Sequence, residues 1–163
     1  MFGSVDAFVV FKCVVTLGLA VWSAIAALNN LVAFGASTGA IGRTLSMSPL
    51  REAPAIDISL LRRAVHAKAL AVMALIAMIV LQGIAAICLA YGGGQLAIAL
   101  ASAGSDATGI HWGMFGLTAL AAAWLLMMIG GLWFGYWIRQ EGLQLTHMML
   151  LVLTIATAAL LRM

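Results

Sequence analysis

The chain of 163 residues is 65% hydrophobic and only 8% charged, with a formal net charge of +3. A soluble globule cannot bury that much apolar surface, so this composition excludes a soluble single-domain protein. The positive charges do not form a basic patch on a soluble nucleic-acid-binding fold. We therefore expect no nucleic-acid partner, and instead contact with the anionic headgroups of membrane lipids.

Four long apolar stretches predict an all-α fold, a bundle of four transmembrane helices that forms one transmembrane domain over residues 1–163. A helix needs about 20 apolar residues to cross a bilayer core about 30 Å thick. No stretch alternates polar and apolar residues, which argues against an outer-membrane barrel. The helices are expected at about 7–33, 67–91, 112–138 and 143–161, with a loop at about 34–66.

The first apolar stretch is interpreted as a retained membrane anchor rather than a secretory signal. It is long, it starts with Asp6 rather than with basic residues, and it has no clear small-residue cleavage site. Cys13 in this stretch and Cys88 in the second should lie at similar depths. We interpret them as free core thiols rather than as a disulfide.

The long loop after the first stretch contains Pro49 and Pro54, so it cannot form one continuous helix. Asp57 or Ser59 is expected to cap a helix that continues into the second span. Most basic residues lie on this side, so the positive-inside rule places it in the bacterial cytoplasm and both termini on the periplasmic side of the inner membrane. These basic residues are Arg43, Arg51, Arg62, Arg63, Lys68 and Arg139.

Two groups of glycines suggest how the later helices are connected and packed. Gly92 to Gly94 are expected to begin a loop, and the short apolar segment after them is expected at the outer membrane interface. Gly131 and Gly135 have the small-xxx-small spacing that lets helix backbones approach each other. We expect this pair to face another helix, either within the chain or in another subunit.

Aromatic and basic residues gather at the expected cytoplasmic surface of the membrane. Tryptophan anchors helices at the headgroup level, and arginine pairs with lipid phosphates. We interpret this set, together with the glycine pair, as a lipid or partner interface: Trp133, Trp137, Arg62, Arg63, Arg139, Gly131 and Gly135.

Two histidines are the candidate cofactor-binding residues. His66 and His147 lie on different helices that enter the membrane from the same side, hence at comparable depth. Two imidazoles on facing helices could ligate a haem b. They could instead line a pocket for a quinone or a lipid headgroup, with Trp133 or Trp137 stacking on it. Apart from these alternatives, no cofactor and no metal site is expected.

The sequence contains no Cys-x-x-Cys, no His-Glu-x-x-His and no phosphate-binding loop. We therefore do not expect an enzyme. The main prediction is a non-catalytic accessory or structural subunit that packs against a larger membrane complex, respiratory or photosynthetic. A haem- or quinone-binding anchor subunit using His66 and His147 is the first alternative.

A small transporter is the second alternative. Ion carriers usually need ionisable residues deep within their spans, and the apolar stretches hold only Thr, Ser and Gln there. Gln82 is interpreted as an interhelical hydrogen-bond partner rather than as part of a permeation path.

Three short segments carry a resemblance to a known family: Asn29-Asn30, Leu45-Ser46-Met47, and Gly130-Gly131-Leu132-Trp133-Phe134 followed by Trp137. On these residues the chain resembles the bacterial family of predicted small integral membrane proteins. The resemblance implies a four-pass membrane fold over most of the chain and no assigned activity. The chain departs from the family pattern at Ser48-Pro49, where acidic and Thr residues are usual, and at Leu132, where Glu is usual.

Overall fold

The computed structural model describes residues 6–102 and 104–163, and the described residues form helices and turns without a strand. Four of the helices are long and apolar enough to cross a membrane: α1 (Ala7–Val32), α4 (Lys68–Ser102), α5 (Ala107–Trp133) and α6 (Glu141–Arg162). The shorter elements are α2 (Phe34–Leu45), α3 (Ser48–Arg51), η1 (Ser59–Arg63) and η2 (Tyr136–Ile138). The expected all-α bundle with four membrane-spanning helices is confirmed.

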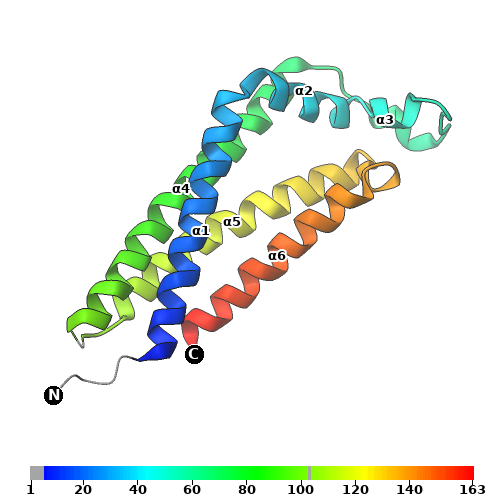
Figure 1. Ribbon diagram of the computed structural model, residues 1–163. Coiled ribbons are helices and arrows are strands. Elements are labelled where there is room, and N and C mark those ends of the chain that lie inside the picture. The colour runs from blue at the N-terminus through cyan, green and yellow to red at the C-terminus, as the bar shows by residue number, and fades with distance from the viewer. Residues whose placement is uncertain (1–5, 103) are drawn as a thin grey trace.

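The long helices form two packed pairs that diverge from each other (Figure 1). α1 packs along α4, α4 packs on α5, and α5 packs on α6. The beginning of α1 and the end of α6 lie at one end of the molecule, which we call the terminal end, and there α6 approaches α1. Toward the other end the two pairs separate, and residues 33–67 run across this end from α1 to the turn between α5 and α6. We call residues 33–67 the cap and this end the cap end.

Glycines bring α4 and α5 into close contact. A Cβ added at Gly92 would lie 2.6 Å from the amide nitrogen of Gly113, and one added at Gly116 would lie 2.5 Å from Cγ of Leu89. Such spacings leave no room for side chains, so the backbones of α4 and α5 meet directly. This contact explains why α4 continues through Gly92 to Gly94 as a helix.

The predicted bounds of the second helix, 67–91, therefore end too early. The prediction that a loop and an interfacial segment follow residue 91 is wrong. α4 has 35 residues and continues to Ser102, which gives a length of about 52 Å at about 1.5 Å per residue. The helix is thus longer than the apolar core of a bilayer, and it reaches beyond that core or crosses it at a tilt.

The third helix also differs from its predicted bounds of 112–138. α5 begins at Ala107 and ends at Trp133, because Gly135 adopts a left-handed conformation (φ 65°) that stops the helix. The ring of Tyr136 then folds back onto Gly131, where an added Cβ would lie 2.5 Å from Cε1 of the ring. Gly131 and Gly135 are both buried inside the chain. The pair is therefore covered by residues of the same chain, Tyr136 over Gly131 and Met47 and Leu50 beside Gly135, and does not form a surface for another subunit.

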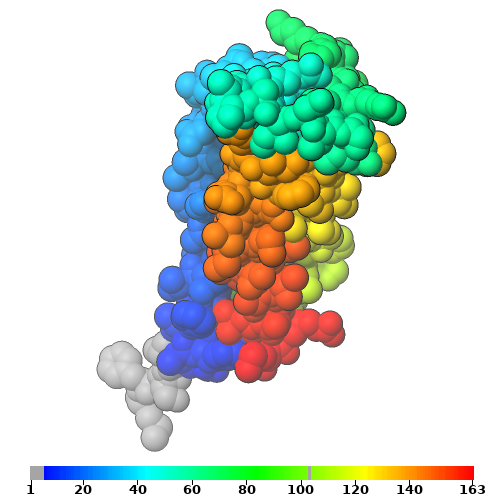
Figure 2. All heavy atoms as spheres, turned by 90° about the vertical axis from the view of Figure 1, so that its right-hand side faces the viewer, coloured from blue at the N-terminus to red at the C-terminus, as the bar shows by residue number. Residues whose placement is uncertain are grey.

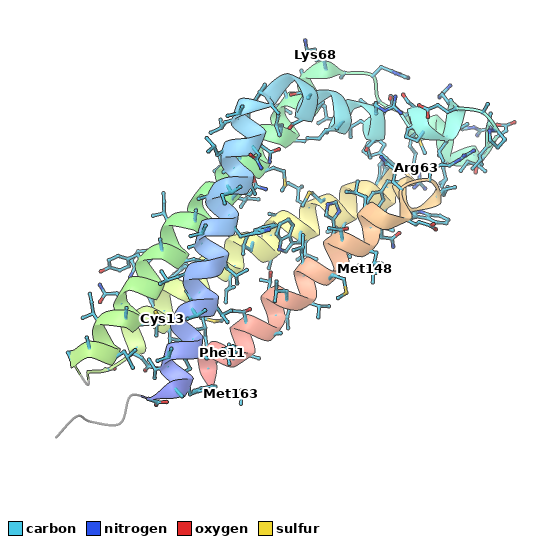
Figure 3. All side chains as sticks on the ribbon, viewed as in Figure 1. Phe11, Cys13, Arg63, Lys68, Met148 and Met163 are labelled. Carbon is cyan, nitrogen blue, oxygen red and sulfur yellow. The ribbon has the colours of Figure 1, made fainter. Side chains whose placement is uncertain are left out.

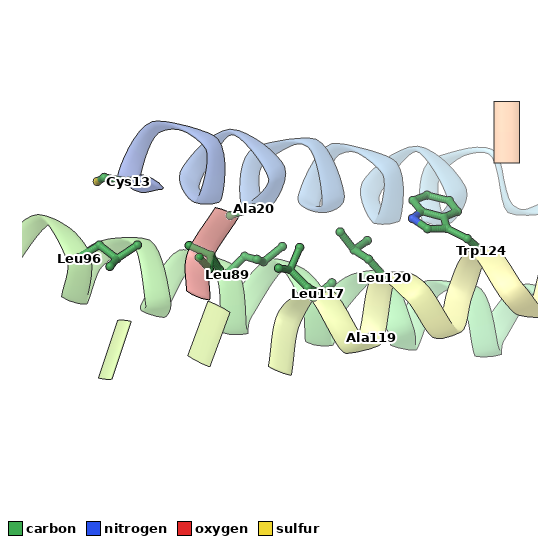
Figure 4. Packing of buried hydrophobic residues seen from close by; sticks show 10 residues of the cluster. Cys13, Ala20, Leu89, Leu96, Leu117, Ala119, Leu120 and Trp124 are labelled. Atoms are coloured by element: carbon green, nitrogen blue, oxygen red, sulfur yellow. The ribbon is translucent and has the colours of Figure 1, made fainter. Parts of the chain in front are cut away.

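The apolar core lies in the terminal half of the bundle and joins all four long helices (Figure 4). Its buried members include Leu89 and Leu96 of α4, Leu117 of α5 and Leu161 of α6, each at most 2% exposed. Burial of leucine side chains stabilises the contact between helices through close packing. The core thus holds the two pairs together at the terminal end.

Three buried or half-buried polar side chains of the spans, Lys12, Asn30 and Gln82, find partners in the chain. Asn30 of α1 donates a hydrogen bond from Nδ2 to Oε1 of Gln82 in α4 at 3.0 Å, which confirms Gln82 as an interhelical partner. Lys12 is buried in α1, and its Nζ lies 3.4 Å from Oδ2 of Asp106 at the start of α5. Cys13 and Cys88 are free thiols.

Candidate functional site

The cap is the part of the chain that could present binding residues at the membrane surface, and it is folded. Residues 34–66 were expected as a loop, yet they contain α2, α3 and η1. Met47 and Leu50 are at most 2% exposed. A Cβ added at Gly135 would lie 3.4 Å from Cε of Met47 and 3.7 Å from Cδ1 of Leu50. Burial of these two apolar side chains against the α5–α6 turn gives the cap a fixed position.

Polar contacts reinforce this attachment of the cap. Thr44 donates from Oγ1 to Oε1 of Gln140 at 3.4 Å, and Arg139 donates to the carbonyl oxygen of Pro54. Arg43 and Glu52 form an exposed ion pair within the cap at 2.6 Å. Exposed pairs contribute at most about 1 kcal/mol, so the buried apolar contacts dominate.

The cap does not continue into α4 as one helix. η1 ends at Arg63, residues 64–67 are not helical, and the amide of Val65 donates to the carbonyl of Leu45 at 2.9 Å. The expectation that Asp57 or Ser59 caps a helix running into the second span is therefore wrong. The hydrogen bond to Leu45 ties this extended stretch to α2 instead.

Two residues of the predicted interface, Arg63 and Trp133, are in contact with each other, and Figure 3 shows Arg63 at the cap end. The guanidinium of Arg63 lies over the ring of Trp133, 4.4 Å from its centroid, and its Nη1 donates to the carbonyl of Trp133 at 3.4 Å. Such a cation–π contact contributes about 0.5–1 kcal/mol at an exposed site. Trp133, Trp137 and Arg62 are exposed. These side chains are therefore accessible to lipids or to a partner.

The two histidines lie in different surroundings. His66 is exposed in the stretch before α4 and lines a groove with α2, whereas His147 is buried in α6. His147 packs against Tyr136, with ring centroids 6.1 Å apart in a stacked arrangement. The groove that contains His66 includes no residue of α5 or α6. The structure therefore does not bring His66 and His147 into a shared pocket.

Tyr136 and His147 share an unusual property among the described residues. The hydroxyl of Tyr136 and Nδ1 of His147 are buried and have no hydrogen-bond partner. Burial raises the pKa of the Tyr136 phenol, so the hydroxyl stays protonated at neutral pH. A buried polar atom without a partner costs about 1–3 kcal/mol, which is why such atoms often mark a site for water or a ligand.

A lateral cavity of about 190 Å³ lies between α1, α5 and α6, on the side of the molecule where α1 and α6 are neighbours (Figure 2). Trp22 of α1 and Trp124 of α5 line it, with their rings in edge contact at 5.3 Å between centroids. Trp124 donates from Nε1 to Oγ1 of Thr154 in α6 at 3.1 Å. The cavity is thus apolar, and its main polar groups already bond to each other.

The family comparison agrees with this architecture. The model of the family described as predicted small integral membrane protein (DUF2165) matches residues 8–163. The chain belongs to this family. No curated protein and no solved structure matches it. The DUF2165 chain is thus an integral membrane protein with four transmembrane helices, as the resemblance seen in the sequence implied.

The described part of this DUF2165 protein contains no group of three or more His, Cys, Asp or Glu side chains that could hold a metal ion. Three features of the described chain could carry a function. They are the cap, the buried Tyr136–His147 pair, and the side of the bundle between α1 and α6 where the two helix pairs separate, which we call the open side. Sequence reasoning missed the glycine face of α5, although Gly109 and Gly113 carry the small-xxx-small spacing that would have revealed it.

Proposed function

We propose that this protein is a non-catalytic accessory subunit that packs against a larger complex, respiratory or photosynthetic, in the bacterial inner membrane. The observation that carries the proposal is the open side between α1 and α6. In a helix bundle each helix buries an apolar stripe against its neighbours. In this chain one of the four contacts between neighbouring helices, that between α1 and α6, is incomplete. α1 and α6 approach each other only near the terminal end.

The burial of the four spans supports this interpretation. In their most apolar stretches, only 22% of the residues of α1 and 17% of those of α6 are buried, against 33% for α4 and 39% for α5. α1 and α6 are therefore the helices with the most surface left for a neighbour. Gly18 on α1 lines the lateral cavity, and a Cβ added there would meet no atom within 4 Å. A transmembrane helix of a partner could approach closely at this point.

The cap end is the expected cytoplasmic side in this proposal. It carries six of the eight Lys and Arg residues, which favours cytoplasmic placement by the positive-inside rule. Trp133 and Trp137 would hold the helix ends at the headgroup level. The exposed basic residues of the cap would then face the cytoplasmic parts of the partner complex.

Photo-crosslinking in the native membrane tests the proposal. A photoreactive amino acid at Leu153, which lines the open side, should crosslink to one protein of discrete mass. The same residue placed at Ile87, on an exposed face of α4, serves as the matched control and should not give that product. Mild extraction and mass spectrometry should recover the same partner. Crosslinks to lipid alone, or to a second copy of this chain, would defeat the proposal.

A quinone-class ligand near Tyr136 and His147 is the second candidate function. The two unpartnered polar atoms favour it, because a quinone carbonyl could accept a hydrogen bond from the Tyr136 hydroxyl. Organic extraction of the purified protein should then yield a stoichiometric quinone that the Tyr136→Phe variant loses. A protein that carries no quinone after gentle purification from quinone-rich membranes counts against this function.

A further inference from the structure

We propose that the groove between α2 and the beginning of α4 binds the headgroup of an anionic phospholipid. This groove has a volume of about 540 Å³ and is separate from the lateral cavity and from the Tyr136–His147 pair. It lies where α1 has ended and α4 begins, and hence at the edge of the membrane-spanning part of the bundle. The proposal does not depend on the accessory-subunit function.

The charge of the groove favours an anion. Lys68, His66 and Arg43 line it, and no Asp or Glu does. Arg43 is already paired with Glu52, whereas Lys68 forms no ion pair with any residue that the structure describes. Lys68 is also the first residue of α4, and the first amides of a helix have no acceptor within that helix. A phosphate at this point would meet both the ammonium group and the positive end of the helix dipole.

Thr38 provides an independent sign that the groove is built for a ligand. It lines the groove, it is only 6% exposed, and its buried hydroxyl has no hydrogen-bond partner within residues 6–102 and 104–163. The hydroxyls of Thr16, Thr154 and Thr157 behave differently, since each donates to the carbonyl four residues earlier at 2.7–2.8 Å. Thr38 makes no such bond although it also lies in a helix. Its hydroxyl is thus free to donate to a phosphate oxygen.

The apolar part of the groove favours a lipid over a free phosphate ion. Phe34 on α2 and Val65, Ala71 and Val72 around the start of α4 line it beside the polar groups. Gly35 and Gly39 keep the α2 side open, because a Cβ at either position would meet no atom within 4 Å. An acyl chain could follow this apolar surface toward the bilayer while the headgroup stays at Lys68. Basic pockets beside transmembrane helices commonly bind lipid headgroups in this way.

A lipid titration of the full-length protein tests the assignment. Protein purified in mild detergent and freed of lipid would be titrated with phosphatidylglycerol or with phosphatidylcholine of the same chains, and the first bound lipid followed by native mass spectrometry. Phosphatidylglycerol should bind at least about fivefold more tightly, as expected for one favourable ammonium contact. Equal affinity for the two lipids would overturn the proposal.

Two variants and one matched control locate the binding. Lys68→Gln should weaken phosphatidylglycerol binding about fivefold, and Gly39→Leu should place a side chain in the groove and weaken binding, since an added Cβ there meets no atom within 4 Å. Arg62→Gln removes the same charge from an exposed residue outside the groove and should leave the affinity within about twofold. Equal loss in Lys68→Gln and Arg62→Gln would show a general charge effect and would overturn the assignment.

Thr38→Val separates a ligand contact from a structural role. Replacing an unpartnered buried hydroxyl with a methyl group should keep or raise the melting temperature, while phosphatidylglycerol binding weakens about fivefold. A variant that binds the lipid as tightly as the parent protein would contradict the proposed role of Thr38. A competition with inorganic phosphate completes the test. If phosphate displaces the lipid at equal concentration, the site binds the anion alone, and this result would overturn the lipid proposal.

Discussion

Gly92 of α4 and Gly113 of α5 bring two helix backbones into direct contact, since a Cβ on Gly92 would lie 2.6 Å from the amide nitrogen of Gly113. A side chain at Gly92 must push the two helices apart. Gly92→Ala should therefore lower the free energy of unfolding by about 1–3 kcal/mol, the usual cost of overpacking. Thermal unfolding in detergent measures the change.

Gly94→Ala is the matched control for this substitution, two residues further along the same helix. A Cβ there meets no atom within 4 Å. Because alanine favours the helix over glycine by about 1 kcal/mol, this variant should be as stable as the parent or slightly more stable. Equal destabilisation by both substitutions would show that the glycines matter for a reason other than the helix contact.

Leu50 anchors the cap to the α5–α6 turn, so its truncation should release the cap. Leu50→Ala should cost about 2–5 kcal/mol of local stability, as for other buried leucines, and should increase proteolytic cleavage within residues 33–67. Leu60→Ala, at a half-buried position in η1, is the control. Limited proteolysis followed by mass spectrometry gives the cleavage sites. Unchanged cleavage in Leu50→Ala would mean that the cap is held by other contacts.

Lys12 and Asp106 should be energetically coupled. The Lys12 side chain is 6% exposed and that of Asp106 is 33% exposed, so the loss of the carboxylate leaves a buried cation unpaired. Asp106→Asn is expected to destabilise the protein by about 1–3 kcal/mol, and adding Lys12→Met should recover part of that loss. A double-mutant cycle on thermal unfolding measures the coupling. Strictly additive effects would exclude it.

The orientation in the membrane can be measured with single cysteines at Arg51 in the cap and at Ser105 between α4 and α5. Both positions are exposed and lie at opposite ends of the bundle. In intact cells an impermeant maleimide should label Ser105→Cys, and it should reach Arg51→Cys only after the membrane is permeabilised. Labelling of Arg51→Cys from outside would reverse the proposed topology. Variants in which Cys13 and Cys88 are replaced by alanine provide the background.

The sequence by itself determined that four helices cross the membrane. About 20 consecutive apolar residues are long enough to cross the bilayer, and within one segment only a helix forms all the backbone hydrogen bonds that the apolar core requires. It also identified Gln82 as an interhelical partner, since a lone amide within an apolar span needs one. The first and last spans, Ala7–Val32 and Glu141–Arg162, lie close to their predicted bounds, and Asp6 at the start of the first span and Glu141 and Arg162 at the ends of the last mark three of those four bounds.

Only the tertiary structure decided what the glycines and the long loop do. A glycine can end a helix or allow two helices to approach closely, depending on its neighbours in space. The sequence alone is consistent with a loop that starts at Gly92, whereas the position of Gly113 beside it shows a contact between helices. Gly131 could likewise be read as a packing surface until Tyr136 was found to cover it. The separation of the two helix pairs, the open side along α1 and α6, and the groove at Thr38 and Lys68 depend on contacts between residues far apart in the chain. Local hydrophobicity carries no information about such contacts, because lipid and protein neighbours are equally apolar.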